Sequence, residues 1–315
     1  MKVITHGQIR SLGIPPAVCV EWVRESFSLK RQAQLPPKIS VHPQGTDFFN
    51  TMPCQLPAPW DRFGVKVVSR IEGATPLLDS LLLLFDSRTG EALALMDADW
   101  ITTMRTGAVA ALAQQTFRRA GELSYAFLGL GNTARATLLC MLESEPERHF
   151  AVRLLQYKGQ ENSFIERFSS YANVSFECED SIPELIRKSD VIFSCVTRAE
   201  GPLCEDDSLF REGCLLVPVH TRGFQNCDLV FDKVFGDDTG HIRGFRYFDR
   251  FRQYAEFGEV LDGSVPGRES ETERILSYNI GLGLHDLVFA ARIHSLLKDR
   301  CPDLSLEKPL DKFWI

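Results

Sequence analysis

Two glycines, Gly129 and Gly131, separate an apolar run from a helix-forming run in the segment YAFLGLGNTARATLLCML. The residues from Tyr125 to Leu128 predict a buried strand, and those from Ala134 onward have helical spacing and good helix formers. Two glycines at such a turn let backbone N–H groups approach a diphosphate, and the helix N-terminus adds partial positive charge. The segment therefore predicts a nucleotide site, with a simple strand-to-helix turn as the alternative.

A second candidate is Arg105, in the segment DADWITTMRTGAVAALAQQTF. Thr102 or Thr103 is expected to cap a helix whose apolar face includes Ala108 and Leu112, which places Arg105 in the first turn. The positive end of a helix disfavours arginine. The side chain is therefore either solvated or retained to bind an anion.

The elements that must position these groups fall into two regimes along the chain. In residues 1–118 we expect a helix at 17–33, short strands at 38–42, 47–52 and 64–69, and a hairpin at 78–97 with its turn at 87–90. From Tyr125 strands and helices alternate, which is typical of a parallel, doubly wound sheet. Helical pieces are expected in 249–261, and a final apolar helix over 284–299 is long enough to pack back on the first region.

The composition is that of an ordinary globular protein with room for two domains. The chain has 315 residues, of which 44% are hydrophobic and 24% charged. The net charge of -7 and the lack of a basic block argue against a nucleic-acid or anionic-membrane surface. The N-terminus MKVITHGQIR has no signal-like apolar core, and the run LLDSLLLLF is too short to span a bilayer. A cytoplasmic protein is therefore expected.

The cysteines and acidic pairs do not indicate a metal. The 9 cysteines include no C-x-x-C pair, and Cys140, Cys195 and Cys214 lie in apolar surroundings, so we expect buried free thiols. Asp237 and Asp238 could suggest a metal, but no histidine has ligand spacing, and strand-end carboxylates more often cap helices or are solvated. No metal site is expected.

Several segments together resemble the ornithine cyclodeaminase and mu-crystallin family. They occur in the family's order and at similar spacing over nearly the whole chain: GVKVVSR, the hairpin, MRTGAVAALA, GLGNTARA, DVIFSCVT and VPGRESETERILSYNIGLGLHD. The RTG segment followed by the glycine turn is more specific than either part alone. The resemblance implies an α/β fold, with a Rossmann-type doubly wound parallel sheet domain (119–287) inserted into a smaller α+β substrate-binding and dimerisation domain (1–118 and 288–315).

The same resemblance implies a homodimeric, NAD(P)-dependent oxidoreductase that acts on a small α-amino or α-imino acid. Lys66 in GVKVV and Arg105 in MRTG would hold the substrate carboxylate, with Lys38 in PPKIS as a third cation. Such cations would fix the α-carbon within reach of a hydride donor. A solvent-exposed strand lysine is the alternative interpretation of Lys66 and Lys38.

The resemblance also implies cofactor contacts. The diphosphate turn is matched by Gly129, Gly131, Asn132, Thr133 and Ala134. Thr197 follows the strand of DVIFSCV, where the family passes the cofactor. The segment that approaches the nicotinamide is matched by Asn279, Gly281 and Asp286.

The segment GCLLVPVHTRGFQNCD departs from the family. It matches GTHINAVGAD, whose closing aspartate is the acid and base of the cyclodeaminases, and a count without gaps from Gly213 places that aspartate on Arg222. Arginine cannot shuttle that proton at neutral pH. Ketimine reductases of the mu-crystallin type also lack the aspartate, so imine reduction is favoured. His220 could donate a proton to a substrate nitrogen, or be a hydrogen-bonded structural group.

A second departure concerns the adenosine ribose. An NAD site usually has an aspartate or glutamate at the end of the second strand. Here VRLLQYKGQ offers Gln156 and Lys158, and no carboxylate before Glu161. The site therefore favours NADP over NAD, with Lys158 as an ordinary surface charge and binding of both cofactors as the alternative.

Three alternatives to a ketimine reductase or amino-acid dehydrogenase stay open. The run RESETER resembles the PGRE-like stretch of siderophore-pathway family members, which make diaminopropionate precursors. The second alternative is a true cyclodeaminase, and the third is a non-catalytic, cofactor-binding protein of the crystallin type. Turnover with imino acids separates the enzymes from the binding protein.

Overall fold

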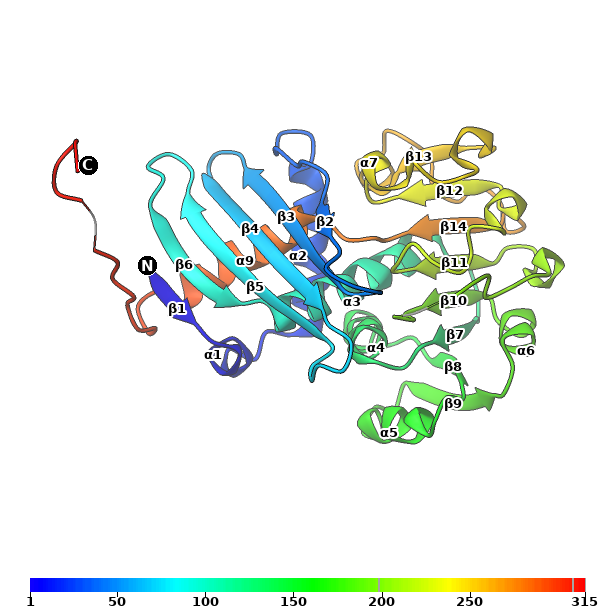
Figure 1. The fold of residues 1–315 in the computed structure, drawn as a ribbon. Coiled ribbons are helices and arrows are strands. Elements are labelled where there is room, and N and C mark those ends of the chain that lie inside the picture. The colour runs from blue at the N-terminus through cyan, green and yellow to red at the C-terminus, as the bar shows by residue number, and fades with distance from the viewer. Residues whose placement is uncertain (198, 308, 315) are drawn as a thin grey trace. The chain divides into compact units, whose positions relative to one another are not determined.

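The computed structural model describes residues 1–197, 199–307 and 309–314 (Figure 1). The chain forms two compact units. Unit 1 comprises Met1–Gly13, Gln32–Ile101 and Asp286–Ile315, and unit 2 comprises Ile14–Arg31 and Thr102–His285. This division differs from the expected one, because residues 14–31 and 102–118 pack with the second unit.

Unit 1 contains a six-stranded sheet. Its strand order is β1 (Lys2–Ile4), β6 (Ala92–Asp97), β5 (Leu78–Asp86), β4 (Arg62–Arg70), β3 (Phe48–Leu56) and β2 (Ile39–Val41). Strand β1 is parallel to β6, and the other neighbours are antiparallel. The expected hairpin is β5 and β6, and Asp86 closes its turn by accepting the N–H groups of Arg88 and Thr89.

The two faces of this sheet differ in their surroundings. Helix α9 (Gly283–Leu297) lies behind the sheet in Figure 1, and a Cβ on Gly64 of β4 would lie 2.5 Å from Leu287 Cδ1. Because side chains alternate along a strand, Lys66 and Val68 face the same way as Gly64 and are buried, whereas Val67 faces the other side and is exposed. A short helix, α1 (His6–Ser11), completes the regular structure at the N-terminal end of unit 1.

Unit 2 contains an eight-stranded sheet whose described strand pairs are all parallel. Its order is β13 (Tyr254–Glu256), β12 (Lys233–Gly236), β14 (Ile275–Tyr278), β11 (Leu215–Pro218), β10 (Val191–Ser194), β7 (Ser124–Leu128), β8 (Phe150–Leu155) and β9 (Val174–Glu179). The chain runs outward from β7 to β9 and then returns to β10 on the other side of β7. The predicted doubly wound sheet is therefore confirmed. In such sheets ligands bind beyond the carboxyl ends of the strands at this point of reversal.

Helices cover both faces of the parallel sheet. Leu128 of β7 packs in one cluster with Leu185 and Ile186 of α6, whereas Phe127 contacts Phe164 of α5 on the opposite face, with ring centroids 5.9 Å apart. The α-helices of unit 2 other than α3 and α9 are α2 (Pro16–Leu29), α4 (Asn132–Ser144), α5 (Gln160–Arg167), α6 (Ile182–Arg187), α7 (Thr239–Ile242) and α8 (Phe257–Leu261). Three 3₁₀ turns are η1 (Asp207–Leu209), η2 (Asp228–Val230) and η3 (Phe248–Arg250).

Helix α3 (Asp99–Phe117) begins earlier than expected. The carboxylate of Asp97 accepts the N–H of Asp99, so the helix starts there and not at Thr102 or Thr103. Arg105 consequently lies beyond the first turn, and the argument from the positive helix end was wrong for this residue. Arg105 is nevertheless buried, and its contacts are described with the candidate site.

Three short strands were not predicted, and the first of them is β1 at the N-terminus. Residues 249–261, expected as helical pieces, form η3, the strand β13 and the helix α8. Strand β14 (ILSY) was also missed, although it lies between β11 and β12 in the sheet. Strands of three or four residues carry too little periodicity to be recognised, and parallel pairing with distant segments stabilises them.

The cysteines are free thiols in the described structure, as predicted. All but Cys178 are buried.

Candidate functional site

Strand β7 ends in a turn that requires glycine. Gly129 has a φ of +81°, in the left-handed region that glycine tolerates without strain. A Cβ at this position would also lie 2.8 Å from the carbonyl oxygen of Cys195, immediately after β10. The turn thus brings the end of β7 against the end of β10, where the order of the strands reverses.

The turn leads into helix α4 with an open N-terminus. Gly131 is the N-cap residue, and no side chain forms a capping hydrogen bond. In the described structure, nothing beyond the local backbone comes within 4 Å of a Cβ on Gly131. Gly131 and Asn132 are exposed, Thr133 is half-buried and Ala134 is buried. The free N–H groups and positive end of a 13-residue helix suit a diphosphate.

Helices α3 and α4 pack with almost no space between their backbones. A Cβ on Gly107 of α3 would lie 2.5 Å from the carbonyl carbon of Ala136 and 2.6 Å from the nitrogen of Thr137. Ala108, Ala110 and Ala111 are buried beside this contact. The small residues of RTGAVAALA therefore let the helix that carries Arg105 lie directly on the helix of the glycine turn.

The end of β8 presents the residues proposed for the adenosine ribose. Gln156 and Lys158 are both exposed, and Lys158 has a positive φ of +52°. Its ammonium lies 5.1 Å from the centroid of the Tyr157 ring. Glu161, in the first turn of α5, accepts the N–H of Tyr157 at 3.1 Å. Lys158 and the carboxylate of Glu161 therefore lie at the same turn. From the sequence, only Lys158 was expected to lie near the ribose.

The ends of β10 and β11 are joined through a histidine. His220 Nε2 lies 2.7 Å from Ser194 Oγ, and His220 Nδ1 accepts the N–H of Arg222 at 3.1 Å. Because Nδ1 is an acceptor, the proton of the neutral ring is on Nε2 and points to Ser194. Burial, aided by the charge of Arg222, lowers the pKa of His220 to about 4. A neutral imidazole with both nitrogens engaged favours a structural role for His220.

Arg222 and Thr197 are exposed at the same edge of the sheet. The guanidinium of Arg222 is a solvated group in the described structure, and its backbone N–H is the part that His220 holds. Neither residue is brought into a buried contact that would assign it a role.

Arg105 is buried, with 5% of its surface exposed. Its guanidinium lies against Gly281, where a Cβ would be 2.8 Å from Arg105 Cζ. A charged group is rarely buried without a purpose or a partner. Burial therefore removes the solvated alternative for Arg105.

Lys66 is buried on β4 and forms an ion pair with Asp286 in the first turn of α9. The distance from Lys66 Nζ to Asp286 Oδ1 is 2.8 Å. The alternative of a solvent-exposed strand lysine is therefore wrong for Lys66. Lys38 is half-buried and immediately precedes β2, so that alternative stays open for it.

Asn279 is buried at the end of β14. Its amide nitrogen lies 3.3 Å from the carbonyl oxygen of Ser277, and its backbone N–H donates to Pro218 at 3.0 Å. Within the described residues its Oδ1 has no hydrogen-bond partner. A buried amide oxygen of this kind offers an acceptor at the carboxyl edge of the sheet.

Two buried carboxyl groups were missed by the sequence interpretation. Asp237 was expected to be capping or solvated, but only its neighbour Asp238 caps a helix, by accepting the N–H of Gly240. Asp237 is fully buried after β12. Asp228 accepts the hydroxyl of Tyr278 at 2.6 Å, and burial raises the pKa of Asp228 to about 7. Local sequence gives no signal for either burial.

Comparison with known proteins agrees with this geometry. The model of the ornithine cyclodeaminase/mu-crystallin family matches residues 14–300. Among curated proteins, the nodulation efficiency protein NfeD of Rhizobium meliloti is 27% identical over 280 residues, which cover 83% of each chain.

Two solved structures share the fold over almost the whole chain. The Δ1-pyrroline-2-carboxylate reductase of Thermococcus litoralis, in complex with NADH and L-proline, superposes with a TM-score of 0.85 at 22% identity and covers 96% of this chain and 100% of the other. An archaeal alanine dehydrogenase dimer with bound NAD gives a TM-score of 0.82 at 21% identity and covers 98% and 99%. Across the described residues, no helix combines the length and apolar character needed to cross a membrane.

Proposed function

Because this chain belongs to the ornithine cyclodeaminase/mu-crystallin family, we propose that it is an NAD(P)-dependent oxidoreductase that transfers a hydride at the α-carbon of an α-amino or α-imino acid. The observation that carries the proposal is the glycine turn at the reversal of strand order, which opens onto the uncapped N-terminus of α4. The dinucleotide supplies or accepts the hydride, and the protein supplies the anion-binding groups that orient the reactants.

Gly129, Gly131, Asn132, Thr133 and Ala134 are proposed to bind the diphosphate. The open position at Gly131 and the free N–H groups of α4 support this assignment. Thr197 and Asn279 are proposed to contact the cofactor further along the carboxyl edge, where Asn279 Oδ1 is an available acceptor within the described residues.

Arg105 and Lys66 are proposed as ligands of the substrate carboxylate, with Lys38 as a further cation. Arg105 is supported by its burial and by its planar head group, which suits two parallel hydrogen bonds to a carboxylate. Lys66 is supported by its burial, and its ion pair with Asp286 fixes the ammonium in one position.

The presence of Arg222 favours reduction of an imine over cyclodeamination. Cyclodeamination needs a group that both accepts and donates a proton, and an arginine at neutral pH cannot accept one. His220 is neutral and holds Ser194 and the backbone of Arg222, so we assign it a positioning role at this edge.

Both cofactors are proposed to bind, with NADP preferred. Lys158 is exposed at the end of β8 and can attract the 2′-phosphate of NADP, whereas Glu161 at the same turn opposes it. Glu161 is already held by the N–H of Tyr157, which leaves Lys158 as the more accessible charge.

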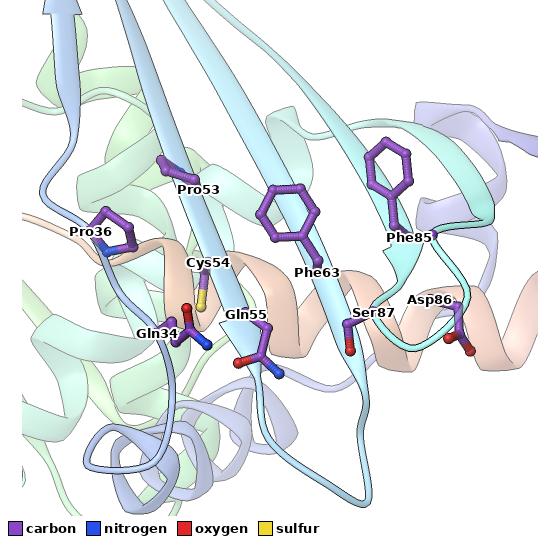
Figure 2. A pocket seen from close by; sticks show the side chains of 10 residues that line it. Gln34, Pro36, Pro53, Cys54, Gln55, Phe63, Phe85, Asp86 and Ser87 are labelled. Atoms are coloured by element: carbon purple, nitrogen blue, oxygen red, sulfur yellow. The ribbon is translucent and has the colours of Figure 1, made fainter.

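A homodimer is proposed to form through the face of the unit 1 sheet opposite α9. Val41 is 60% exposed and lies opposite Phe49, and Leu81 is 52% exposed and lies opposite Val67. Figure 2 shows Phe63 and Phe85 on the same face, with α9 behind the sheet. Exposed apolar side chains gathered on one face of a sheet are typical of a protein interface. A second copy of the sheet offers a matching apolar face, and the archaeal alanine dehydrogenase with the same fold is a dimer.

The test of the function is turnover. The protein is incubated with NADPH or NADH and either cyclic ketimine carboxylates or pyruvate with ammonia, and nicotinamide oxidation is followed by absorbance. We expect saturable oxidation with at least one imino acid and none with the corresponding compound that lacks the carboxylate. Cofactor binding without turnover of any of these compounds would support the non-catalytic alternative.

A further inference from the structure

The guanidinium of Arg105 lies directly against the backbone of Gly281. A Cβ built on Gly281 would overlap Arg105 Nη1 and would lie 2.8 Å from Cζ and 2.9 Å from Nη2. The φ of Gly281 is +98°, which residues with side chains rarely adopt. Space and backbone conformation therefore both require glycine at the place where the arginine rests.

Gly281 is held in turn by a buried carboxylate. Its N–H donates to Asp237 Oδ2 at 2.5 Å, and Asp237 has no exposed surface. Burial acts to raise the pKa of Asp237, but the imidazole of His241 and the N–H of Gly281 outweigh burial and hold the pKa below its ordinary value. An ionised acceptor makes a stronger hydrogen bond to an N–H than a neutral one does.

The backbone around this contact is fixed at several points. The N–H of Asp237 donates to the carbonyl of Tyr278 at 3.1 Å, and Lys30 Nζ donates to the carbonyl of Asp237 at 2.9 Å. The N–H of Asn279 donates to the carbonyl of Pro218. The segment of residues 279–281 therefore cannot retreat easily from Arg105.

We propose that Gly281, held by Asp237, is a positioning residue for Arg105 and sets where the guanidinium meets the substrate carboxylate. The proposal rests on the function proposed above and deepens it. Two parallel hydrogen bonds to a carboxylate require the planar guanidinium in one orientation, and a long side chain does not hold that orientation by itself. The backbone of Gly281 provides the surface that fixes it.

The experiment measures the reduction of Δ1-pyrroline-2-carboxylate by NADPH in the full-length protein. For Gly281→Ala we expect KM for the imino acid to rise about tenfold or more, with a smaller change in kcat and the Kd for NADPH within about twofold of wild type. Gly263→Ala is the matched control, because Gly263 also has a positive φ, +78°, but has no heavy atom within 4 Å of its Cβ position among the described residues. This control should leave KM unchanged.

A double-mutant cycle shows whether residue 281 acts through Arg105. Arg105→Ala should raise KM further than Gly281→Ala, and Gly281→Ala should add nothing in the Arg105→Ala background. Asp237→Asn keeps the shape of the side chain and weakens the hydrogen bond to Gly281. It should therefore raise KM by a smaller factor, and it should not change KM further in the Arg105→Ala variant. This milder variant keeps the test available if Gly281→Ala does not fold.

The outcomes separate the two proposals. An unchanged KM in both Gly281→Ala and Asp237→Asn overturns the positioning role, as do effects that multiply with that of Arg105→Ala. An unchanged KM in Arg105→Ala contradicts the carboxylate assignment of the proposed function and not the contact between Gly281 and Arg105.

Discussion

Lys66 and Asp286 form an ion pair of 2.8 Å in which neither side chain exposes more than 1% of its surface. They come from a central strand and from the first turn of α9. Removal of water from both charges is costly, and their mutual attraction offsets that cost only while both are present. The pair therefore makes the stability of unit 1 depend on two residues that are distant in the sequence.

Asp286→Ala should lower the free energy of unfolding by about 3 to 5 kcal/mol, because it leaves the ammonium of Lys66 buried without this counter-ion. Urea denaturation followed by circular dichroism measures the change. The double variant Lys66→Met with Asp286→Leu should recover most of the loss. Lys2→Ala is the control: it breaks the exposed pair with Asp303 and should cost no more than about 1 kcal/mol. If Asp286→Ala lowered the free energy of unfolding by less than Lys2→Ala does, the role of the pair would be contradicted.

His220→Gln should flatten the pH dependence of stability between pH 4 and pH 6.5. The pKa of His220 is lowered from 6.5 to about 4 in the folded protein, so the unfolded chain binds this proton first as the pH falls. The contribution of His220 to the free energy of unfolding is fully present above pH 6.5. It is lost as the pH falls toward 4, at up to about 1.4 kcal/mol per pH unit. Urea denaturation at a series of pH values measures the slope. The exposed His149→Gln is the control, and parallel curves for wild type and His220→Gln would contradict the burial effect.

The parallel sheet and its glycine turn could be predicted because their signals are local. The glycines of GLGNTA lie between a strand and a helix within one short segment, and the structure has β7, the turn and α4 there. The pairing of Lys66 with Asp286 and the contact of Arg105 with Gly281 depend on segments that meet only after folding. The burial of Asp237 was missed for the same reason. An aspartate pair predicts helix capping or solvation until the position of Gly281 is known. Sequence spacing contains no information about such contacts without the path of the chain.

Lys158→Asp should shift the proposed preference from NADP toward NAD by about tenfold or more, because it replaces an attractive charge with a repulsive one near the expected position of the 2′-phosphate. The measurement is the ratio of the dissociation constants of NADPH and NADH by fluorescence titration. Lys298→Asp, at an exposed position of unit 1, is the control for a general change of charge. An unchanged ratio for Lys158→Asp would show that Lys158 does not approach the ribose.

Ornithine should yield no proline with the wild-type protein, because we expect Arg222 to occupy the position of the aspartate of the cyclodeaminases. Arg222→Asp should give at most a trace of this activity, since a displacement of about an ångström in a catalytic group can cost on the order of 100-fold in rate. Chromatographic detection of proline, together with an ammonia assay, measures both. Conversion of ornithine by the wild type at rates typical of enzymes would refute the reductase assignment.

Leu81→Lys should convert the proposed dimer into monomers, because each copy would bury an unpaired ammonium in the interface at a cost of several kcal/mol. Sedimentation equilibrium measures the mass. Leu306→Lys is the matched control: Leu306 is 65% exposed but lies outside the sheet. A wild-type protein that sediments as a monomer at high concentration would contradict the interface.

The close packing of Gly107 on Ala136 has a consequence for how substrate preference can change. Arg105 lies two positions before Gly107 on α3, and α4 begins a few residues before Ala136 at the proposed diphosphate site. The residue proposed to bind the carboxylate and the residues proposed to bind the diphosphate are thus attached to two backbones in direct contact. The contact between the two helices would therefore fix the distance between the two proposed anion sites. If Arg105 and the glycine turn bind as proposed, a new substrate can differ in whatever extends away from its α-carbon, whereas the spacing from its carboxylate to the cofactor is set by the two helices.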